Sequence, residues 1–101
     1  MIDINSLDKF IESKENEVTN IRPDTEKKII WASKNNQKTK TSLVFIHGFS
    51  ATRFELSPVI EMLGKELQAN IFFTRLKGHG QDGKALGEAT YDDWMIDIDE
   101  A

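Results

Sequence analysis

Residues 42–49 read Ser-Leu-Val-Phe-Ile-His-Gly-Phe, and this stretch decides the fold class. Its apolar residues are consecutive rather than alternating, which is typical of a strand covered on both faces. Residues 70–74, Asn-Ile-Phe-Phe-Thr, read as a second covered strand. Between the two, Ser57 as N-cap and Pro58 at the first helical position predict a helix start. The apolar face of this helix would consist of Val59, Ile60, Leu63 and Leu67. Residues 42–74 are therefore expected to form a strand, helix and parallel strand joined by a right-handed crossover, as in α/β proteins.

Residues 5–18 precede this unit and have the apolar spacing of an amphipathic helix. Leu7, Phe10, Ile11, Lys14 and Val18 follow this spacing and would form its inner face. Charged residues would form its outer face: Asp8, Lys9, Glu12, Glu15 and Glu17. Residues 28–32 predict a short strand, followed by a polar loop over 33–41. The chain is therefore divided into an N-terminal helix with its linker, residues 1–25, and an α/β portion, residues 26–101.

A final helix is expected from Thr90, because Asp93 three residues later completes a capping pattern. Its apolar stripe would consist of Tyr91, Trp94, Met95 and Ile98. Its last turn carries Asp97, Asp99 and Glu100, whose negative charge opposes the helix dipole, and it contains neither glycine nor a basic residue. This pattern predicts that the native helix continues beyond Ala101.

The composition narrows the function classes. A chain of 101 residues allows at most one domain, and its 39% apolar and 30% charged residues fit a globular protein. The absence of cysteine excludes a disulfide framework and a catalytic thiol, and the net charge of −4 argues against nucleic-acid binding. The longest apolar run is 43–46, and the first residues lack a basic leader pattern. These features predict a cytoplasmic protein without a membrane span.

Both histidines lie in glycine-containing loops that follow the two apolar strands, His47 before Gly48 and His79 between Gly78 and Gly80. Open α/β sheets bind ligands at the carboxyl ends of their strands, so these loops are the candidate site. Metal binding has little support, because His79 and Asp82 alone do not form a site. No cofactor is expected.

Three interpretations of the loops are open. Residues 78–83 match the dinucleotide-binding pattern G-x-G-x-x-G. However, residues 75–77 separate the pattern from the strand at 70–74, and no helix is expected to begin at Gly83. Ser50 lies between a strand and a helix, as a nucleophile would, but lacks the second glycine of a nucleophile elbow. Alternatively, Gly48 frees the backbone so that the Phe49 N–H forms half of an oxyanion hole, with the Phe49 ring lining an acyl pocket.

Residues 44–53, Val-Phe-Ile-His-Gly-Phe-Ser-Ala-Thr-Arg, resemble the oxyanion-loop segment of α/β-hydrolases, in particular the carboxylesterase, monoglyceride-lipase and serine-aminopeptidase-like group. Residues 75–80, Arg-Leu-Lys-Gly-His-Gly, resemble the second signature of this group. Residues 91–94 resemble the start of the helix that leads to its nucleophile strand, and residues 21–31 are similar to the leader of one bacterial subfamily.

The resemblance implies a partial α/β-hydrolase fold with an N-terminal helix, about three strands in a mostly parallel sheet and flanking helices. It places Phe49 at the oxyanion-hole position, and makes His47, Gly48, Ser50, Gly78, His79 and Gly80 residues that shape the site. No Gly-x-Ser-x-Gly occurs in the chain, so the fold is expected to stop before the nucleophile elbow.

The implied function is that of an amino-terminal part of a serine hydrolase for carboxylic esters or related acyl bonds, inactive by itself and without a triad. The alternative is a non-catalytic, truncated or split-gene module. In this alternative, strand 43–46 would present an unpaired apolar edge for self-association or for a complementary fragment.

Overall fold

A computed structural model describes residues 4–33, 36–49 and 51–101. A short 3₁₀ helix, η1 (Ile4–Ser6), leads into α1 (Leu7–Asn16), which is followed by β1 (Lys28–Ile30) and β2 (Ser42–Phe45). Then come a second 3₁₀ turn, η2 (Arg53–Glu55), and α2 (Ser57–Leu67), β3 (Asn70–Phe73), α3 (Gly83–Glu88) and α4 (Tyr91–Glu100). None of the helices in the described part is long and apolar enough to cross a membrane.

The described strands form one sheet in the order β1-β3-β2. β2 pairs in parallel with β3 with Val44 opposite Phe72, which confirms the parallel unit expected over 42–74. β1 pairs antiparallel with the other side of β3, with Ile29 opposite Phe72. The expected mostly parallel sheet is therefore wrong: the sheet is mixed, with one pair of each kind, and the general α/β class holds.

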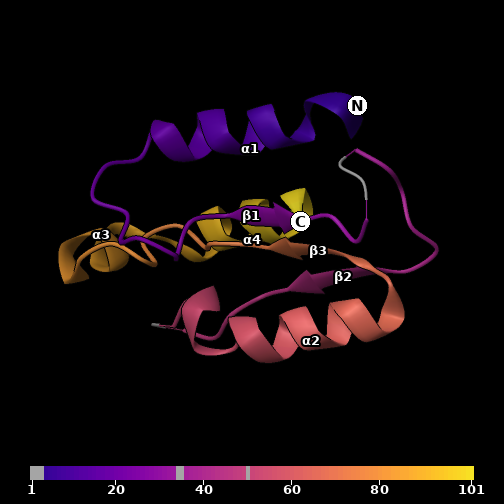
Figure 1. The fold of residues 1–101 in the computed structure, drawn as a ribbon. Helices are drawn as coiled ribbons and strands as arrows, with labels where there is room; N and C mark the ends of the chain where they lie inside the picture. Colours follow the sequence, from indigo (N-terminus) through magenta and orange to yellow (C-terminus); the bar gives the residue numbers. More distant parts are fainter. Residues whose placement is uncertain (1–3, 34–35, 50) are drawn as a thin grey trace.

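Helices cover the two faces of the sheet unequally (Figure 1). α2 lies on one face, where Gly64 approaches Ile71 so closely that an added Cβ would be 2.4 Å from the Ile71 Cδ1 atom. α1 and α4 lie on the other side of the sheet, with α1 above the strands and α4 behind them in this view. The buried apolar core is small; it consists of Ile11, Ala69, Ile71, Phe73 and Leu76.

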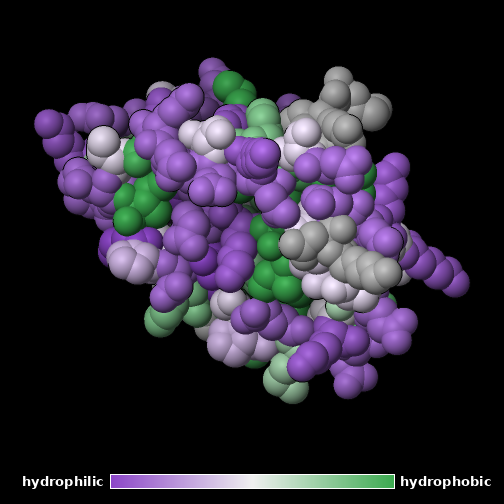
Figure 2. Space-filling view, turned by 45° about the horizontal axis from the view of Figure 1, so that its top comes forward, coloured by the Kyte–Doolittle hydropathy of each residue, from purple (hydrophilic) through white to green (hydrophobic). Residues whose placement is uncertain are grey.

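β2 is an edge strand, and the expectation that it is covered on both faces is wrong. Val44 on β2 is 48% exposed, and Ile46 just after it is 42% exposed. β3 is better covered, because it lies between two strands and its Ile71 and Phe73 face α2. The consecutive apolar residues of β2 are thus not explained by burial within the described chain. Figure 2 shows hydrophobic residues exposed in the middle and at the left of a face that is mostly hydrophilic.

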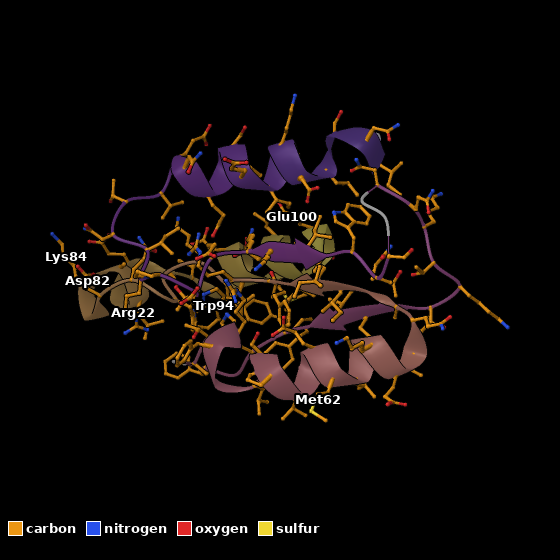
Figure 3. All side chains as sticks on the ribbon, viewed as in Figure 1. Arg22, Met62, Asp82, Lys84, Trp94 and Glu100 are labelled. Atoms are coloured by element: carbon orange, nitrogen blue, oxygen red, sulfur yellow. The ribbon has the colours of Figure 1, made fainter. Side chains whose placement is uncertain are left out.

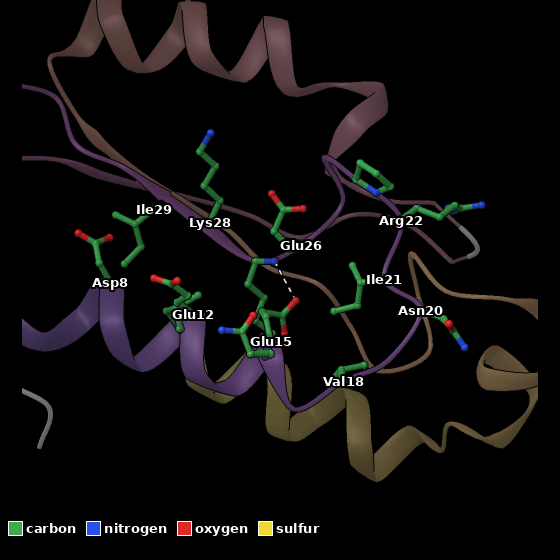
Figure 4. Close-up of a pocket in the computed structure, with 14 residues that line it drawn as sticks. Asp8, Glu12, Glu15, Val18, Asn20, Ile21, Arg22, Glu26, Lys28 and Ile29 are labelled. Carbon is green, nitrogen blue, oxygen red and sulfur yellow. Dashed lines mark hydrogen bonds between the residues drawn. The ribbon is translucent and has the colours of Figure 1, made fainter.

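α1 is held to the sheet by a buried ion pair rather than by apolar packing alone. The Glu15 carboxylate lies 2.7 Å and 3.0 Å from the Nε and Nη2 atoms of Arg75, and both side chains are buried. The Lys27 N–H also donates to Glu15, at 3.0 Å, as the dashed line in Figure 4 shows. The prediction that Glu15 lies on the outer face of α1 is therefore wrong. Beside this carboxylate is a 660 Å³ hollow whose lining is rich in charged residues, which Figure 4 shows in close-up.

The last turn of α4 is neutralised by lysines from other elements. Glu100 accepts hydrogen bonds from Lys14 on α1 and, at 2.7 Å, from Lys27, which also donates to Asp97 at 3.0 Å. Burial lowers the pKa of Lys27, but its bonds to Glu100 and Asp97 outweigh this effect and hold the pKa above its ordinary value. Burial likewise raises the pKa of Glu100, yet the two lysines hold it below its ordinary value. Figure 3 shows Glu100 between α1 and the sheet.

The helix ends agree with expectation only in part. The capping box of Thr90 and Asp93 is present, and the bond from the Thr90 N–H holds the pKa of Asp93 below its ordinary value. The cap of α2 is Leu56 rather than Ser57, and Tyr91 and Met95 are exposed instead of joining the apolar stripe of α4. A helix does begin at Gly83, contrary to expectation, because the Asp82 carboxylate caps it by accepting from the Ala85 N–H at 2.8 Å.

Candidate functional site

The two glycine-containing loops meet at the carboxyl ends of β2 and β3. The His47 and His79 rings lie with their centroids 4.6 Å apart, and both histidines are buried. The two histidines predicted for the site are thus brought together from positions 32 residues apart in the sequence. Parallel pairing of β2 and β3 causes this meeting, because it places both strand ends at the same edge of the sheet.

His47 is held in one tautomer by two backbone groups. The Leu76 N–H donates to the His47 Nε2 atom at 3.1 Å, so this nitrogen is the unprotonated acceptor. The proton of the neutral ring therefore lies on Nδ1, which is 2.9 Å from the Gly48 carbonyl oxygen and donates to it. Through these bonds His47 links the end of β2 to the chain that follows β3. Sequence spacing alone could not have indicated this role.

The 78–80 loop depends on its glycines. Gly78 and Gly80 have φ values of +84° and +74°, a left-handed conformation that glycine adopts without steric cost. The loop is also tied down from outside, because the Arg22 N–H donates to the Gly80 carbonyl at 2.6 Å and Arg75 Nη1 donates to the His79 carbonyl at 3.2 Å. Arg75 was not predicted as a site residue, although it immediately precedes the Leu76 that bonds His47.

Gly48 is placed differently from what the sequence suggested. Gly48 is absent from the described residues with positive φ, and an added Cβ there would meet no atom within 4 Å, so the expected need for glycine freedom at this position is wrong. The turn is closed by the Ala51 N–H, which donates to the Gly48 carbonyl at 3.1 Å. Ser50 lies outside the described residues.

Phe49 and Trp94 complete an aromatic cluster around His79. The Phe49 ring is exposed and lies edge-on to His79 at 6.0 Å and to Trp94 at 5.8 Å, while Trp94 lies 5.6 Å from His79. The Trp94 Nε1–H donates to the Lys77 carbonyl at 2.9 Å, which fixes α4 against the 78–80 loop. Figure 3 labels Trp94 at this end of the sheet. The sequence placed Trp94 on the packing stripe of α4 but not beside Phe49.

The loop after β2 is anchored by Arg53. Its Nε and Nη2 atoms donate to the carbonyl and the carboxylate of Glu26, at 2.8 Å and 2.7 Å, and its guanidinium lies 5.8 Å from the centre of the Phe73 ring. Thr74, the next residue, is fully buried, and no group in the described part of the chain hydrogen-bonds its hydroxyl. The described residues contain no group of three or more His, Cys, Asp or Glu arranged to hold a metal.

The chemistry open to this arrangement is limited to binding and polarisation. Two buried imidazole rings, an exposed aromatic side chain and the backbone of residues 48, 49 and 51 can orient a carbonyl-containing ligand, but the described residues supply no nucleophile next to a base. No protein-family model matches the chain, and no curated protein matches it in sequence.

The loop geometry makes Gly78 sensitive to substitution. A Cβ at position 78 would lie 2.7 Å from the Ala85 carbonyl oxygen and 2.8 Å from the Leu86 Cα atom, both of them backbone atoms that cannot rotate away. We expect Gly78→Ala to lower the free energy of unfolding by about 2–3 kcal/mol, from the positive φ and the overpacking together. Chemical denaturation followed by tryptophan fluorescence measures the change.

Gly87→Ala is the matched control, because a Cβ at position 87 in α3 would meet no atom within 4 Å. This substitution is expected to leave stability unchanged or to raise it by up to about 1 kcal/mol, since alanine favours helix over glycine. Equal losses for the two variants would contradict the close approach of the 78–80 loop to α3.

Proposed function

We propose that this chain is the amino-terminal part of a serine hydrolase for carboxylic esters or related acyl bonds, in which the Phe49 N–H is one donor of the oxyanion hole. The observation that carries the proposal is the contact of the His47 and His79 rings at 4.6 Å, which joins the two loops that resemble the hydrolase signatures. A loop held in this way is preorganised, so a donor on it need not reorganise during the reaction.

The roles of the residues follow from their contacts. His47 positions the Gly48 carbonyl and thereby the Gly48–Phe49 peptide group, which carries the Phe49 N–H. The exposed Phe49 ring, packed on His79 and Trp94, would form one wall of the acyl pocket. His79 is then a shaping residue and not the base, because its ring is buried against His47 and its Nδ1 atom is 3.3 Å from the Lys77 carbonyl oxygen.

The coding sequence downstream of Ala101 is the first test. A continuous reading frame with Gly-x-Ser-x-Gly within about 20–30 residues is expected, since one helix end and one strand fill that length. In the protein extended in this way, Phe49→Pro removes the N–H and is expected to lower kcat for p-nitrophenyl butyrate by about 100-fold or more, whereas Phe49→Leu keeps the N–H and most of kcat.

The 101-residue chain itself is expected to leave p-nitrophenyl butyrate unhydrolysed above the buffer rate, and Ser50→Ala is expected to change nothing. Product formation that disappears with Ser50→Ala would contradict the proposal and make Ser50 the nucleophile. Equal losses for Phe49→Pro and Phe49→Leu in the extended protein would overturn the role of the Phe49 N–H.

A second candidate function is favoured by a separate observation, the exposed edge of β2. In this alternative the chain is a non-catalytic module that pairs through β2 with a complementary strand. Val44 and Ile46 would then be covered by the partner, which would account for apolar residues at an edge that the described chain leaves exposed. If the edge is open, the backbone amides of Val44 and Ile46, which point away from β3, are expected to exchange hydrogen quickly in a dilute solution of the chain.

A further inference from the structure

The outer edge of β2 offers unpaired main-chain groups. The Thr74 N–H donates to the Phe45 carbonyl at 3.2 Å, so the polar main-chain groups of Phe45 face β3. Successive residues of a strand direct these groups to opposite sides, and those of Val44 and Ile46 therefore face away from β3. β2 has neither proline nor a charged side chain, the devices by which proteins usually protect such an edge.

One flank of α2 extends this edge. Gly64 faces Ile71, and Pro58, Glu61, Met62 and Lys65 line a hollow together with Ile30 and Trp31 from the β1 side. By helical spacing, Val59, Leu63 and Leu67 then lie on the opposite flank, toward β2. All three side chains are exposed. The side chains of Val44 and Ile46 lie on the opposite face of the sheet, because Val44 pairs with Phe72 while the adjacent Ile71 faces α2. We call Val44, Ile46, Val59, Leu63 and Leu67, which border the β2 edge on its two faces, the β2-edge surface.

The exposed area of the chain is larger than its mass requires. A monomeric protein of 11.5 kDa exposes about 5,800 Å² by the usual scaling. This chain exposes 6888 Å², an excess of roughly 1,100 Å² over that scaling. Each partner in a standard-sized protein interface buries about 800 Å². The excess is thus sufficient for one stable interface, and the β2-edge surface holds five of the large hydrophobic residues that are exposed in the described part of the chain.

We propose that the β2-edge surface is where two copies of this chain pair, with β2 antiparallel to β2 of the second copy about a two-fold axis beside Val44. This inference rests on the second candidate function and names its partner. In this register the N–H of each Val44 donates to the carbonyl of the other, and the two three-stranded sheets become one continuous sheet. The same axis places both α2 helices on one face, with Leu63 and Leu67 of the two copies in contact.

Charge and symmetry favour a second copy as the partner. An isologous interface brings every residue near its own symmetry mate, so a charged edge would repel itself. The β2-edge surface contains no charged residue, and Glu61 and Lys65 lie on the other flank of α2. Glu66 borders Val59 and Leu63 by helical spacing, but on the side of α2 that points away from the sheet, so the strand edge itself carries no charge that would repel its symmetry mate.

Sedimentation velocity with light scattering tests the pairing across about 1–300 µM, where an interface of this size is expected to dissociate. The expected result is a shift from 11.5 kDa to twice that mass. Leu63→Lys and Met62→Lys form a matched pair, because the residues are adjacent on α2 but lie on opposite flanks. Leu63→Lys is expected to weaken dimerisation at least about tenfold, and Met62→Lys less than about twofold. Circular dichroism verifies that both variants fold, and Val44→Lys tests the strand itself.

A monomer at every concentration overturns the self-pairing, as does a dimer that Leu63→Lys and Val44→Lys leave intact or that Met62→Lys weakens equally. Hydrogen exchange separates these failures from failure of the second candidate function. Fast exchange at positions 44 and 46 in a persistent monomer leaves an open edge for a different strand. Slow exchange in a monomer means that the edge is covered within the chain, and both ideas then fail.

Discussion

Arg75→Met is expected to lower the free energy of unfolding by about 3–5 kcal/mol, because it leaves the buried Glu15 carboxylate without its cation. Glu15 would retain only the Lys27 N–H, and the His79 carbonyl would lose the bond from Arg75 Nη1. The loss is a large part of the 5–15 kcal/mol that ordinarily stabilises a domain. Urea denaturation followed by circular dichroism is the measurement.

Two further variants make this prediction specific. Lys77→Met removes a cation from the same segment, but Lys77 is exposed and lies 3.5 Å from Asp93, so a loss of only about 0.5 kcal/mol is expected. The double variant Glu15→Met with Arg75→Met removes both charges and should recover part of the loss. Recovery would be incomplete, because the Lys27 N–H and the His79 carbonyl still lack partners. A loss below about 1 kcal/mol for Arg75→Met alone would show that water reaches the pair.

Phe73→Ala is expected to cost about 3–5 kcal/mol through the cavity that it leaves at the centre of the sheet. Phe73 is fully buried, and its ring lies edge-on to Phe45 at 6.0 Å and below the Arg53 guanidinium. Removing the ring therefore also loosens Arg53, which anchors the loop after β2. The free energy of unfolding is again the quantity measured.

Phe54→Ala is the matched control, since it removes the same group from a side chain that is 63% exposed. A change within about 0.5 kcal/mol is expected for it. If the two substitutions cost the same, β3 is not the centre of the core. Should Phe73→Ala unfold the chain entirely, Phe73→Leu still reports the packing, with an expected loss of about 1 kcal/mol.

The elements that could be predicted are those whose signals are local. The apolar runs at 42–46 and 70–74 located two strands, and the Thr90–Asp93 pattern located the start of α4. The short helix α3 was missed because Gly83 and Gly87 lower helix propensity, although the Asp82 cap was visible in the sequence. The location of a capping residue thus carried more information than the composition of the helix it begins.

The parts that could not be predicted depend on contacts between distant residues. Glu15 has the spacing of an exposed residue on α1, and only the presence of Arg75, 60 residues later, makes its burial favourable. The meeting of His47 and His79 could be anticipated from strand order. The tautomer of His47 could not, because it is set by the Leu76 N–H. For the same reason, the position of Trp94 beside Phe49 could not be predicted from the sequence.

The lysines at the end of α4 also affect how the chain can fold during its synthesis. Lys14 and Lys27 precede Glu100 by 86 and 73 residues, so they leave the ribosome long before the carboxylate that they bind. Until then α1 has no ionic contact with α4, and Lys27, which is buried in the final fold, remains hydrated. Closing such long loops is slow. We therefore expect this contact to form late, because it joins residues translated early to residues translated much later, and ribosome-bound chains ending before residue 97 should lack it.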